Sequence, residues 1–472
     1  MRLFEQTRTE QDSLGEKQIS KEVYWGIHTA RAIENFPISG APIGSMGHLV
    51  MALAYVKKAA ALTNMELGVL DKLRAEAIVW ACDELIASKW DKELVVDVIQ
   101  GGAGTSTNMN VNEVIANLAL ERLGYPKGRY DVLHPIDHVN ASQSTNDVYP
   151  TALRLAAWLS IEKLLSAMRL LREAFERKAV EFEDIIKIGR TQLQDAVPMS
   201  LGQEFRAFAI MLGEDELRLR EARTLISELN LGATAIGTGI NAPLGYASRV
   251  VIVLAEISEI PVVAAENLIE ATQDTGAFVQ LSGVLKRIAC KLSKVCNDLR
   301  LLSSGPQAGF CEILLPARQA GSSIMPGKVN PVIPEVVNQV AFEVIGNDLT
   351  ITMASEAGQL QLNAFEPIIG WSLHKSLRHL IQAVDTLRVN CVDGIKANEE
   401  LLAERVARSA TLATALSPLI GYERSAILAK GALSSGKTVA QVAGELGIFE
   451  PVELQKLLEP KNLLRPFIRK KS

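Results

Sequence analysis

Apolar residues recur at steps of three and four over long parts of the chain, which is the spacing of one face of an α-helix. Between residues 151 and 188 there is no glycine or proline, and one such stripe comprises Trp158, Ile161, Leu165, Met168, Leu171, Phe175 and Phe182. The pattern predicts a helix there, and similar patterns predict helices at about 199–231, 262–304, 332–365 and 368–396. Five long helices indicate a mainly α protein built on a helix bundle, not a doubly wound sheet.

The long helices are flanked by segments of a different character. Residues 1–50 contain two prolines, at 37 and 42, and several glycines, and they predict irregular structure, whereas 51–90 show a helical pattern. The C-terminal part contains only short helical pieces and finishes in the basic tail RKKS. We therefore expect an N-terminal domain at 1–140, a central long-helix bundle at 141–396 and a small C-terminal helical domain at 397–472.

Two predicted helical segments are apolar over more than one face. They are VVNQVAFEVIGND and NLIEATQDTGAFVQLSGVLKRIACKLSKV. A helix tolerates this composition when it is buried on several sides. Association of identical chains through the long helices would supply that burial.

Composition narrows the class of protein. Apolar residues make up 48% of the 472 residues, which is enough for a substantial core. Lysine and arginine total 49 against 54 acids, so there is no basic excess for nucleic acid. The five cysteines form no C-x2-C pair, which predicts reduced thiols and neither a disulfide framework nor a zinc site. Without an apolar signal core or membrane-length apolar run, we expect a cytoplasmic protein with no membrane partner.

Four stretches are dense in small hydroxyl and amide residues: GGAGTSTNMNVNEV at 101–114, HVNASQSTNDVYPTA at 138–152, GRTQLQDAVPMSLGQEF at 189–205 and GSSIMPGKVNP at 321–331. Each alone is explained by helix capping and turns. Clusters such as Ser144-Thr145-Asn146, however, offer more donors than one cap needs. Helix N-termini attract anions, and Lys328 would add a full positive charge, so together the stretches indicate a carboxylate-binding site.

This arrangement is compatible with a demanding deprotonation. An enzyme that removes a proton from the carbon next to a carboxylate must stabilise a second negative charge on that carboxylate in the transition state. Fixed hydrogen-bond donors do so without reorganisation. Gly321 and Gly327 would let their loop approach a ligand closely or close over it.

GSSIMPGKVNP, with SQSTND and GRTQLQDA, resembles the signature set of the fumarase/aspartase superfamily of lyases. The likeness covers nearly the whole chain and is strongest to the ammonia-lyase branch in EVYWGIHTARAIENFPIS, VDVIQGGAGTSTNMNVNEV, NLGATAIGTGIN, NDLRLLSSGPQAG and SEAGQLQLNAFEPIIG. The resemblance implies a helical core that forms a twenty-helix bundle in a homotetramer, with active sites assembled from three subunits.

The resemblance also implies roles for individual residues. Ser322 would be the general base that takes a proton from Cβ of L-aspartate, and Ser323, Lys328 and Asn330 would hold one substrate carboxylate. The remaining substrate-binding residues would be Thr105, Ser144, Thr145, Asn146, Thr191 and Gln192. Ammonia would then leave an aci-carboxylate intermediate by reversible anti-elimination to give fumarate. No cofactor is expected to be required, and Mg²⁺ is implied only as an activator.

Other members of the superfamily are the main alternatives. Fumarate hydratases resemble GRTHLQDA where this chain has Gln192, and typically have a second serine at the position of Thr145. Ammonia-lyases carry either residue at the first position, so Gln192 argues against a hydratase without excluding it. A lyase of a substituted aspartate would need a larger pocket. A non-catalytic structural protein would have lost loop residues such as Ser322 and Lys328, which are present. The N-terminus and the C-terminal part depart from the family pattern, so the resemblance implies nothing about regulation.

Two further patterns predict no site. GALSSGKT at 431–438 matches the phosphate-binding pattern G-x4-G-K-[ST], but the preceding RSAILAKGAL has a helical rather than a strand pattern. We interpret it as a turn between helices. The six histidines include no H-x3-H pair, so no metal site is predicted.

Overall fold

The computed structural model describes residues 6–464 of the chain. Helices account for 62% of the structure, which confirms the predicted mainly α fold. Within the described residues, the strands form four two-stranded sheets. The chain divides into two compact units, which are described one at a time. Unit 1 comprises Met1–Leu165, Leu217–Ala289 and Phe342–Ile381, and unit 2 comprises Ser166–Glu216, Cys290–Ala341 and Gln382–Ser472.

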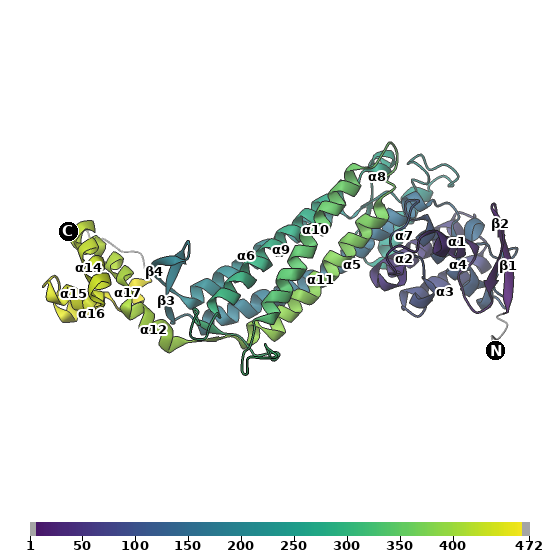
Figure 1. Cartoon of the computed structure of the whole chain (residues 1–472). Coiled ribbons are helices and arrows are strands. Elements are labelled where there is room, and N and C mark those ends of the chain that lie inside the picture. Colours follow the sequence, from purple (N-terminus) through teal and green to yellow (C-terminus); the bar gives the residue numbers. More distant parts are fainter. Residues whose placement is uncertain (1–5, 465–472) are drawn as a thin grey trace. The chain divides into compact units, whose positions relative to one another are not determined.

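Figure 1 shows five long helices. By their residue ranges, each contributes a segment to both units. They are α5 (Thr145–Glu181), α6 (Leu201–Leu225), α9 (Gly276–Leu302), α10 (Val332–Glu356) and α11 (Glu366–Asn390). The periodicity thus predicted every long helix, although several ends were wrong. The helix expected at 262–304 is broken, since the short α8 (Leu268–Gln273) precedes α9. The break has a local cause: Asp274 accepts a hydrogen bond from the backbone N–H of Gly276 at 3.0 Å.

In unit 1 the helices α2, α3 and α4 pack side by side (Figure 1). The expectation of irregular structure over residues 1–50 was wrong in part, because this region includes a β-hairpin and a helix. The unit contains β1 (Thr7–Asp12), β2 (Gly15–Ser20), α1 (Ile27–Asn35), α2 (Gly47–Glu66), α3 (Lys72–Ile86), α4 (Thr105–Arg122), β5 (Glu228–Leu229), α7 (Tyr246–Ser258) and β6 (Val263–Ala264). Residues 107–120 of α4 are all buried, so this helix forms the centre of the unit.

The bundle segments of unit 1 are joined by polar contacts. Asp348 of α10 accepts hydrogen bonds from Ser282 and Lys286 of α9, at 2.8 and 2.6 Å. His379 of α11 contacts Glu343 of α10 at 2.6 Å. These pairs fix the helices against one another where a wholly apolar interface would permit sliding.

Unit 2 has an aromatic core. Phe175 of α5 and Phe205 and Phe208 of α6 pack with ring centroids 5.6 to 6.0 Å apart, and Phe182 just beyond α5 lies 5.2 Å from Phe205. The predicted stripe along α5 is therefore confirmed as core here: Met168, Leu171, Phe175 and Phe182 are buried. Aromatic rings in such tilted and edge-to-face pairs contribute more than their buried area alone.

The remaining elements of unit 2 include a hairpin that the sequence reading missed. It is formed by β3 (Ile186–Thr191) and β4 (Gln194–Ser200), which pair antiparallel. The other elements are β7 (Ile313–Leu314), β8 (Lys396–Ala397), α12 (Glu399–Arg408), α13 (Ala413–Ile420), α14 (Tyr422–Ser435), α15 (Val439–Glu445), α16 (Pro451–Leu457) and α17 (Pro460–Leu463). The three-domain boundaries expected from the sequence stay a prediction, and the basic tail RKKS lies outside the described residues.

The phosphate-loop pattern at 431–438 was expected to be a turn between helices, but residues 431–435 form the last turn of α14 and only Gly436 and Lys437 lie between α14 and the cap of α15. Gly436 follows α14 in a left-handed conformation with φ of 70°. Thr438 then caps α15, and its side chain and that of Gln441 form a reciprocal capping box. These residues therefore serve the helix ends.

Candidate active site

The first group of candidate residues lies at the N-terminus of α4 in unit 1. Thr105 is the first residue of this helix, and its hydroxyl donates to the carbonyl of Gly102 at 2.7 Å. Gly104 has φ of 90°, and a Cβ there would lie 2.4 Å from the ring of Tyr149. A glycine is therefore required where the chain turns into α4, and it brings the exposed Thr105 to the positive end of the helix.

The second group lies at the start of α5. Ser144 donates its backbone N–H to Asp147 at 2.9 Å, and its hydroxyl accepts from the backbone N–H of Asn146 at 3.3 Å. Part of this cluster therefore caps the helix, which is the ordinary role of such residues at a helix start. Thr145 accepts from the side chain of Asn108 in α4 at 3.0 Å, so the fold brings the first two groups together.

A third segment of unit 1, residues 230–235, is tied to the same helix start. Asp147 accepts from the backbone N–H groups of Gly232 and Thr234, both at 3.0 Å, and Asn146 donates to the carbonyl of Ala235 at 2.8 Å. Pro150 in α5 has no N–H for the carbonyl of Asn146, and Asn230 donates to that oxygen instead at 3.0 Å. These contacts were not foreseen from the sequence.

Two buried charges support the turn that precedes α5. Lys57 of α2 is fully buried and donates to Asn140 and Gln143 at 2.8 and 2.9 Å. Burial lowers the pKa of Lys57 to about 7. Burial likewise raises the pKa of Asp147 to about 6, although its backbone hydrogen bonds oppose the shift. The sequence signal for Lys57 was a lysine within the apolar, alanine-rich α2, and it was not recognised.

In unit 2, Thr191 and Gln192 lie at the tip of the β3–β4 hairpin. Thr191 pairs with Gln194, which leaves Gln192 and Leu193 as a two-residue turn. Both turn residues have left-handed backbones, with φ of 53° and 63°. Such a turn normally uses asparagine or glycine, so the backbone is strained where Thr191 and Gln192 are exposed.

The loop at 321–330, also in unit 2, is closed at its base. Gly321 donates to the carbonyl of Lys328, and the side chain of Asn330 donates to the carbonyl of Gly321, both at 2.8 Å. Ser322 is half-buried, and its hydroxyl oxygen accepts from the backbone N–H groups of Ile324 and Met325 at 3.2 and 2.9 Å. Ser323 and Lys328 are exposed.

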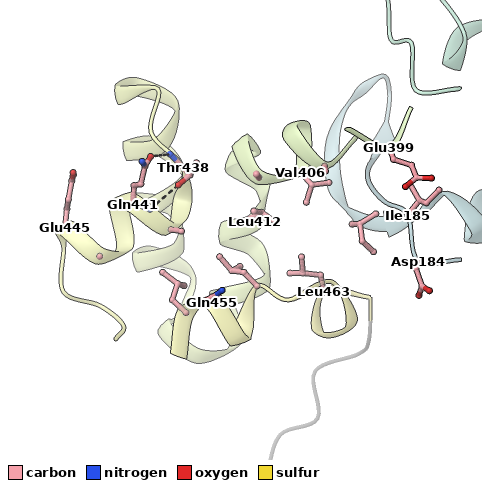
Figure 2. A pocket seen from close by; sticks show the side chains of 17 residues that line it. Asp184, Ile185, Glu399, Val406, Leu412, Thr438, Gln441, Glu445, Gln455 and Leu463 are labelled. Carbon is pink, nitrogen blue, oxygen red and sulfur yellow. Dashed lines mark hydrogen bonds between the residues drawn. The ribbon is translucent and has the colours of Figure 1, made fainter. Parts of the chain in front are cut away.

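Lys328 and Asn330 line a cavity of about 430 Å³, and its other polar lining residues include Arg300, Ser303 and Ser304. A larger cavity of about 880 Å³ lies elsewhere in unit 2 (Figure 2). It is lined mainly by apolar side chains such as Ile185, Val406, Leu412 and Leu463, and by none of the candidate site residues. The smaller cavity is therefore the one of these two that candidate residues line, and its lining combines the polar groups with apolar side chains such as Leu314 and Val329.

The candidate residues are thus distributed over the two units of one chain. Unit 1 holds Thr105 and 144–146, and a hydrogen bond from Asn108 of α4 to Thr145 joins the starts of the two helices. Unit 2 holds Thr191, Gln192 and the 321–330 loop. Among residues 6–464, no cluster of three or more His, Cys, Asp or Glu side chains could hold a metal ion. In the same part of the chain, no helix combines the length and apolar character that crossing a bilayer requires.

Comparison with known proteins identifies the family to which the chain belongs. The family described as Lyase matches residues 15–346, and the family Fumarase C C-terminus matches 412–465. The chain is 55% identical over 464 residues to an aspartate ammonia-lyase of Helicobacter pylori, covering 98% of this chain and 99% of the other. It is 53% identical over 465 residues to that of Escherichia coli K12, covering 98% and 97%.

Solved structures agree. The fumarate lyase:delta crystallin from Brucella melitensis bound to cobalt matches with a TM-score of 0.95 and 57% identity, over 98% of this chain and 100% of that one. A class II fumarase from Schistosoma mansoni matches with a TM-score of 0.91 and 36% identity, over 96% and 98%. The chain belongs to the fumarase/aspartase superfamily of lyases. Within this superfamily it is a carbon–nitrogen lyase.

Proposed function

We propose that the chain catalyses the reversible anti-elimination of ammonia from L-aspartate to give fumarate. The observation that carries the proposal is the likeness to aspartate ammonia-lyases at 53 to 56% identity over nearly the full length. The clusters of hydroxyl and amide groups at the starts of α4 and α5 and in the 321–330 loop suit a dicarboxylate substrate.

In this mechanism Ser322 is the general base that takes the proton from Cβ. A serine hydroxyl is a weak base in water, because its deprotonated form is strongly disfavoured there. The two backbone N–H groups that donate to the Ser322 oxygen, from Ile324 and Met325, would stabilise the negative charge of that form. The nearby Lys328 adds positive charge in the same loop.

The carbanion that forms is stabilised as an aci-carboxylate, with two negative charges on one carboxyl group. Ser323, Lys328 and Asn330 bind this carboxylate and supply the donors that its second charge needs. Thr105, Ser144, Thr145, Asn146, Thr191 and Gln192 bind the other carboxylate and the amino group. Ammonia then leaves from the neighbouring carbon, on the face opposite to the abstracted proton, and the double bond of fumarate forms.

We further propose a homotetramer whose active sites combine residues of three subunits. Its support is an apolar stripe along α10, formed by exposed side chains at three- and four-residue steps: Phe342 63%, Ile345 38%, Leu349 61% and Met353 64%. A helix with such a stripe is expected to be covered by another helix. Turnover requires no resident cofactor in this proposal, and Mg²⁺ acts only as an activator.

Fumarate hydration is the second candidate, favoured by the structural match to a class II fumarase. The test follows the ultraviolet absorbance of fumarate with purified protein, given L-aspartate in one cuvette and L-malate in another. Fumarate from L-aspartate alone is the expected result. Fumarate from L-malate alone would move the assignment to a hydratase, and fumarate from neither would contradict both.

Replacing Ser322 tests the base. We expect Ser322→Ala to lower kcat by roughly a hundredfold to ten-thousandfold while the native mass is unchanged, because a general base contributes on that scale. The matched comparison is Ser323→Ala, which removes one of the donors to the aci-carboxylate and should lower kcat by a smaller factor, because Lys328 and Asn330 remain. A Ser322→Ala enzyme with wild-type kcat would refute the assignment.

A further inference from the structure

A cluster of buried charges in unit 2 surrounds Glu312, which is only 1% exposed. Its carboxylate lies 2.7 Å from the Lys187 ammonium and 2.5 Å from the Arg190 guanidinium, with Arg405 farther off at 3.7 Å. Lys187 is also buried and has a second carboxylate partner, Glu204, at 2.6 Å. The Glu312 carboxylate is therefore the common partner of three cations.

The cluster holds Glu312 as an anion. Burial opposes its ionisation, but the hydrogen bonds and charges of Arg190 and Lys187 outweigh burial and keep the pKa of Glu312 below its usual range. A buried ion pair contributes little net stability compared with an apolar replacement, whereas removal of one partner leaves an uncompensated charge. Such a cluster specifies one geometry more than it adds stability.

The geometry that it specifies is that of the β3–β4 hairpin tip. Arg190 directly precedes Thr191, and its guanidinium is held from one side by Glu312 and lies 4.3 Å from the centre of the Phe310 ring. The next two residues of the chain form the strained left-handed turn that includes Gln192. A strained turn keeps its conformation only when the surrounding structure fixes it. Arg190 links the tip to that structure, because it directly precedes Thr191 and its side chain is bound by Glu312.

Glu312 itself is anchored by the backbone around it. The side chain of Asn398 donates to the carbonyl of Cys311 at 3.0 Å, and its backbone N–H donates to the carbonyl of Glu312 at 2.9 Å. Arg405 of α12 donates to the carbonyl of Phe310. The strand β7 follows at once and pairs with β8, and the chain then runs on to the 321–330 loop. Residues 310–314 are thus held in place by these contacts, and Arg190 bonds the hairpin tip to them through Glu312.

We propose that Glu312 is a positioning residue, which fixes through Arg190 the hairpin tip that presents Thr191 and Gln192 to the substrate. The inference rests on the proposed function for the identity of that substrate. Glu312 does not touch the substrate in this arrangement. Its effect is to keep the Thr191 hydroxyl and the Gln192 amide in the geometry that binding and turnover need, where small displacements have large effects on rate.

The variant Glu312→Gln tests this proposal, with Glu204→Gln as the matched control. Both substitutions remove one carboxylate charge from Lys187, but only the first removes the partner of Arg190. We expect Glu312→Gln to raise KM for L-aspartate by roughly tenfold, through the displaced tip. Glu204→Gln should keep the wild-type KM and kcat. Equal effects of the two variants would overturn the proposal.

A second variant covers the case in which Glu312→Gln does not fold. Arg190→Gln removes the link to the tip but leaves the Glu312–Lys187 pair in place, and should raise KM by a similar factor. Arg190→Lys, which keeps the charge but loses the forked geometry, should restore part of the loss. The double variant of Arg190 and Glu312 should be no worse than either single variant, because both changes break one link. A wild-type KM in soluble Arg190→Gln would contradict the role.

Hydrogen–deuterium exchange of residues 189–195 separates this inference from the proposed function. Faster exchange there in Glu312→Gln, and wild-type exchange in Glu204→Gln, supports the positioning role whatever the substrate. If the wild-type protein does not act on L-aspartate, the proposed function fails, and the exchange result still decides the role of Glu312. Unchanged exchange at the tip in Glu312→Gln would overturn it.

Discussion

At the scale of single residues, buried ionisable groups are the main feature of this chain. Glu366 at the start of α11 is 2% exposed, and one of its carboxylate oxygens has no hydrogen-bond partner. Burial raises the pKa of Glu366 from 4.5 to about 8, although the charge of Arg154 opposes the shift. An ionised glutamate at a helix start stabilises the helix. Burial of Glu366 disfavours its ionised form, so the stability of the fold depends on pH.

Glu366 predicts a pH dependence of stability. Its pKa is higher in the folded than in the unfolded chain, so the folded state binds more protons between pH 4.5 and about 8. The free energy of unfolding therefore falls as pH rises through that window, by at most about 1.4 kcal/mol for each unit of pKa difference. We expect Glu366→Gln, whose side chain stays neutral, to flatten this decline in melting temperature.

The slope of the melting temperature against pH is the quantity to compare, because loss of the charge near Arg154 also shifts the absolute stability. The exposed Glu356, at the end of α10, provides the control. Glu356→Gln should keep the wild-type slope. Parallel curves for Glu366→Gln and the wild type would show that Glu366 does not titrate in this way.

At the scale of elements, the starts of α4 and α5 are held together by close backbone packing. Gly104 lies against the ring of Tyr149 of α5, with no room for a side chain. Two residues earlier, Gly102 has nearly the same left-handed backbone, but a Cβ there would meet nothing closer than 3.8 Å. Substitutions at these two glycines can therefore distinguish the cost of backbone strain from the cost of a steric clash.

Alanine at these two positions should have different effects. Gly102→Ala is expected to cost roughly 1–2 kcal/mol from the left-handed backbone. Gly104→Ala should cost roughly 1–3 kcal/mol more, because the methyl group overpacks against Tyr149, and should also raise KM by displacing Thr105. Melting temperature and KM, measured on both variants, provide the check. Equal melting temperatures would mean that the Tyr149 contact relaxes without cost.

At the scale of the whole molecule, the unpartnered apolar stripe of α10 decides the expected assembly. Leu349 and Met353 are 61% and 64% exposed on this helix, whereas Leu73 on α3 is a comparably exposed leucine, at 64%, outside the stripe. Burial of a charged side chain between helices is strongly unfavourable, but an exposed one is tolerated.

We therefore expect Leu349→Glu to reduce the native mass from four chains towards one and to abolish turnover, since each proposed active site needs three subunits. Leu73→Glu should leave both the mass and the activity unchanged. Native mass spectrometry and the fumarate assay measure the two effects. A Leu349→Glu protein that remains an active tetramer would contradict the role of the stripe.

Local signals predicted the long helices and located the candidate site residues, but they missed features that depend on distant contacts. The β3–β4 hairpin escaped notice because its turn, Gln192-Leu193, lacks the asparagine or glycine that marks such turns. The helical pattern at 262–304 continued across a turn that the side chain of Asp274 stabilises. In both places a side chain or a neighbouring segment overrides the local preference.

The sequence by itself determined the mainly α architecture and the lyase family, because helical periodicity and short motifs are properties of neighbouring residues. Only the tertiary structure showed that Asp147 joins the start of α5 to Gly232 and Thr234, and that Glu312 holds Arg190 from 122 residues away. Contacts at such separations leave no periodic trace along the chain. They form because buried charges and backbone N–H groups must find partners once water is excluded, and only the folded chain decides which partners are within reach.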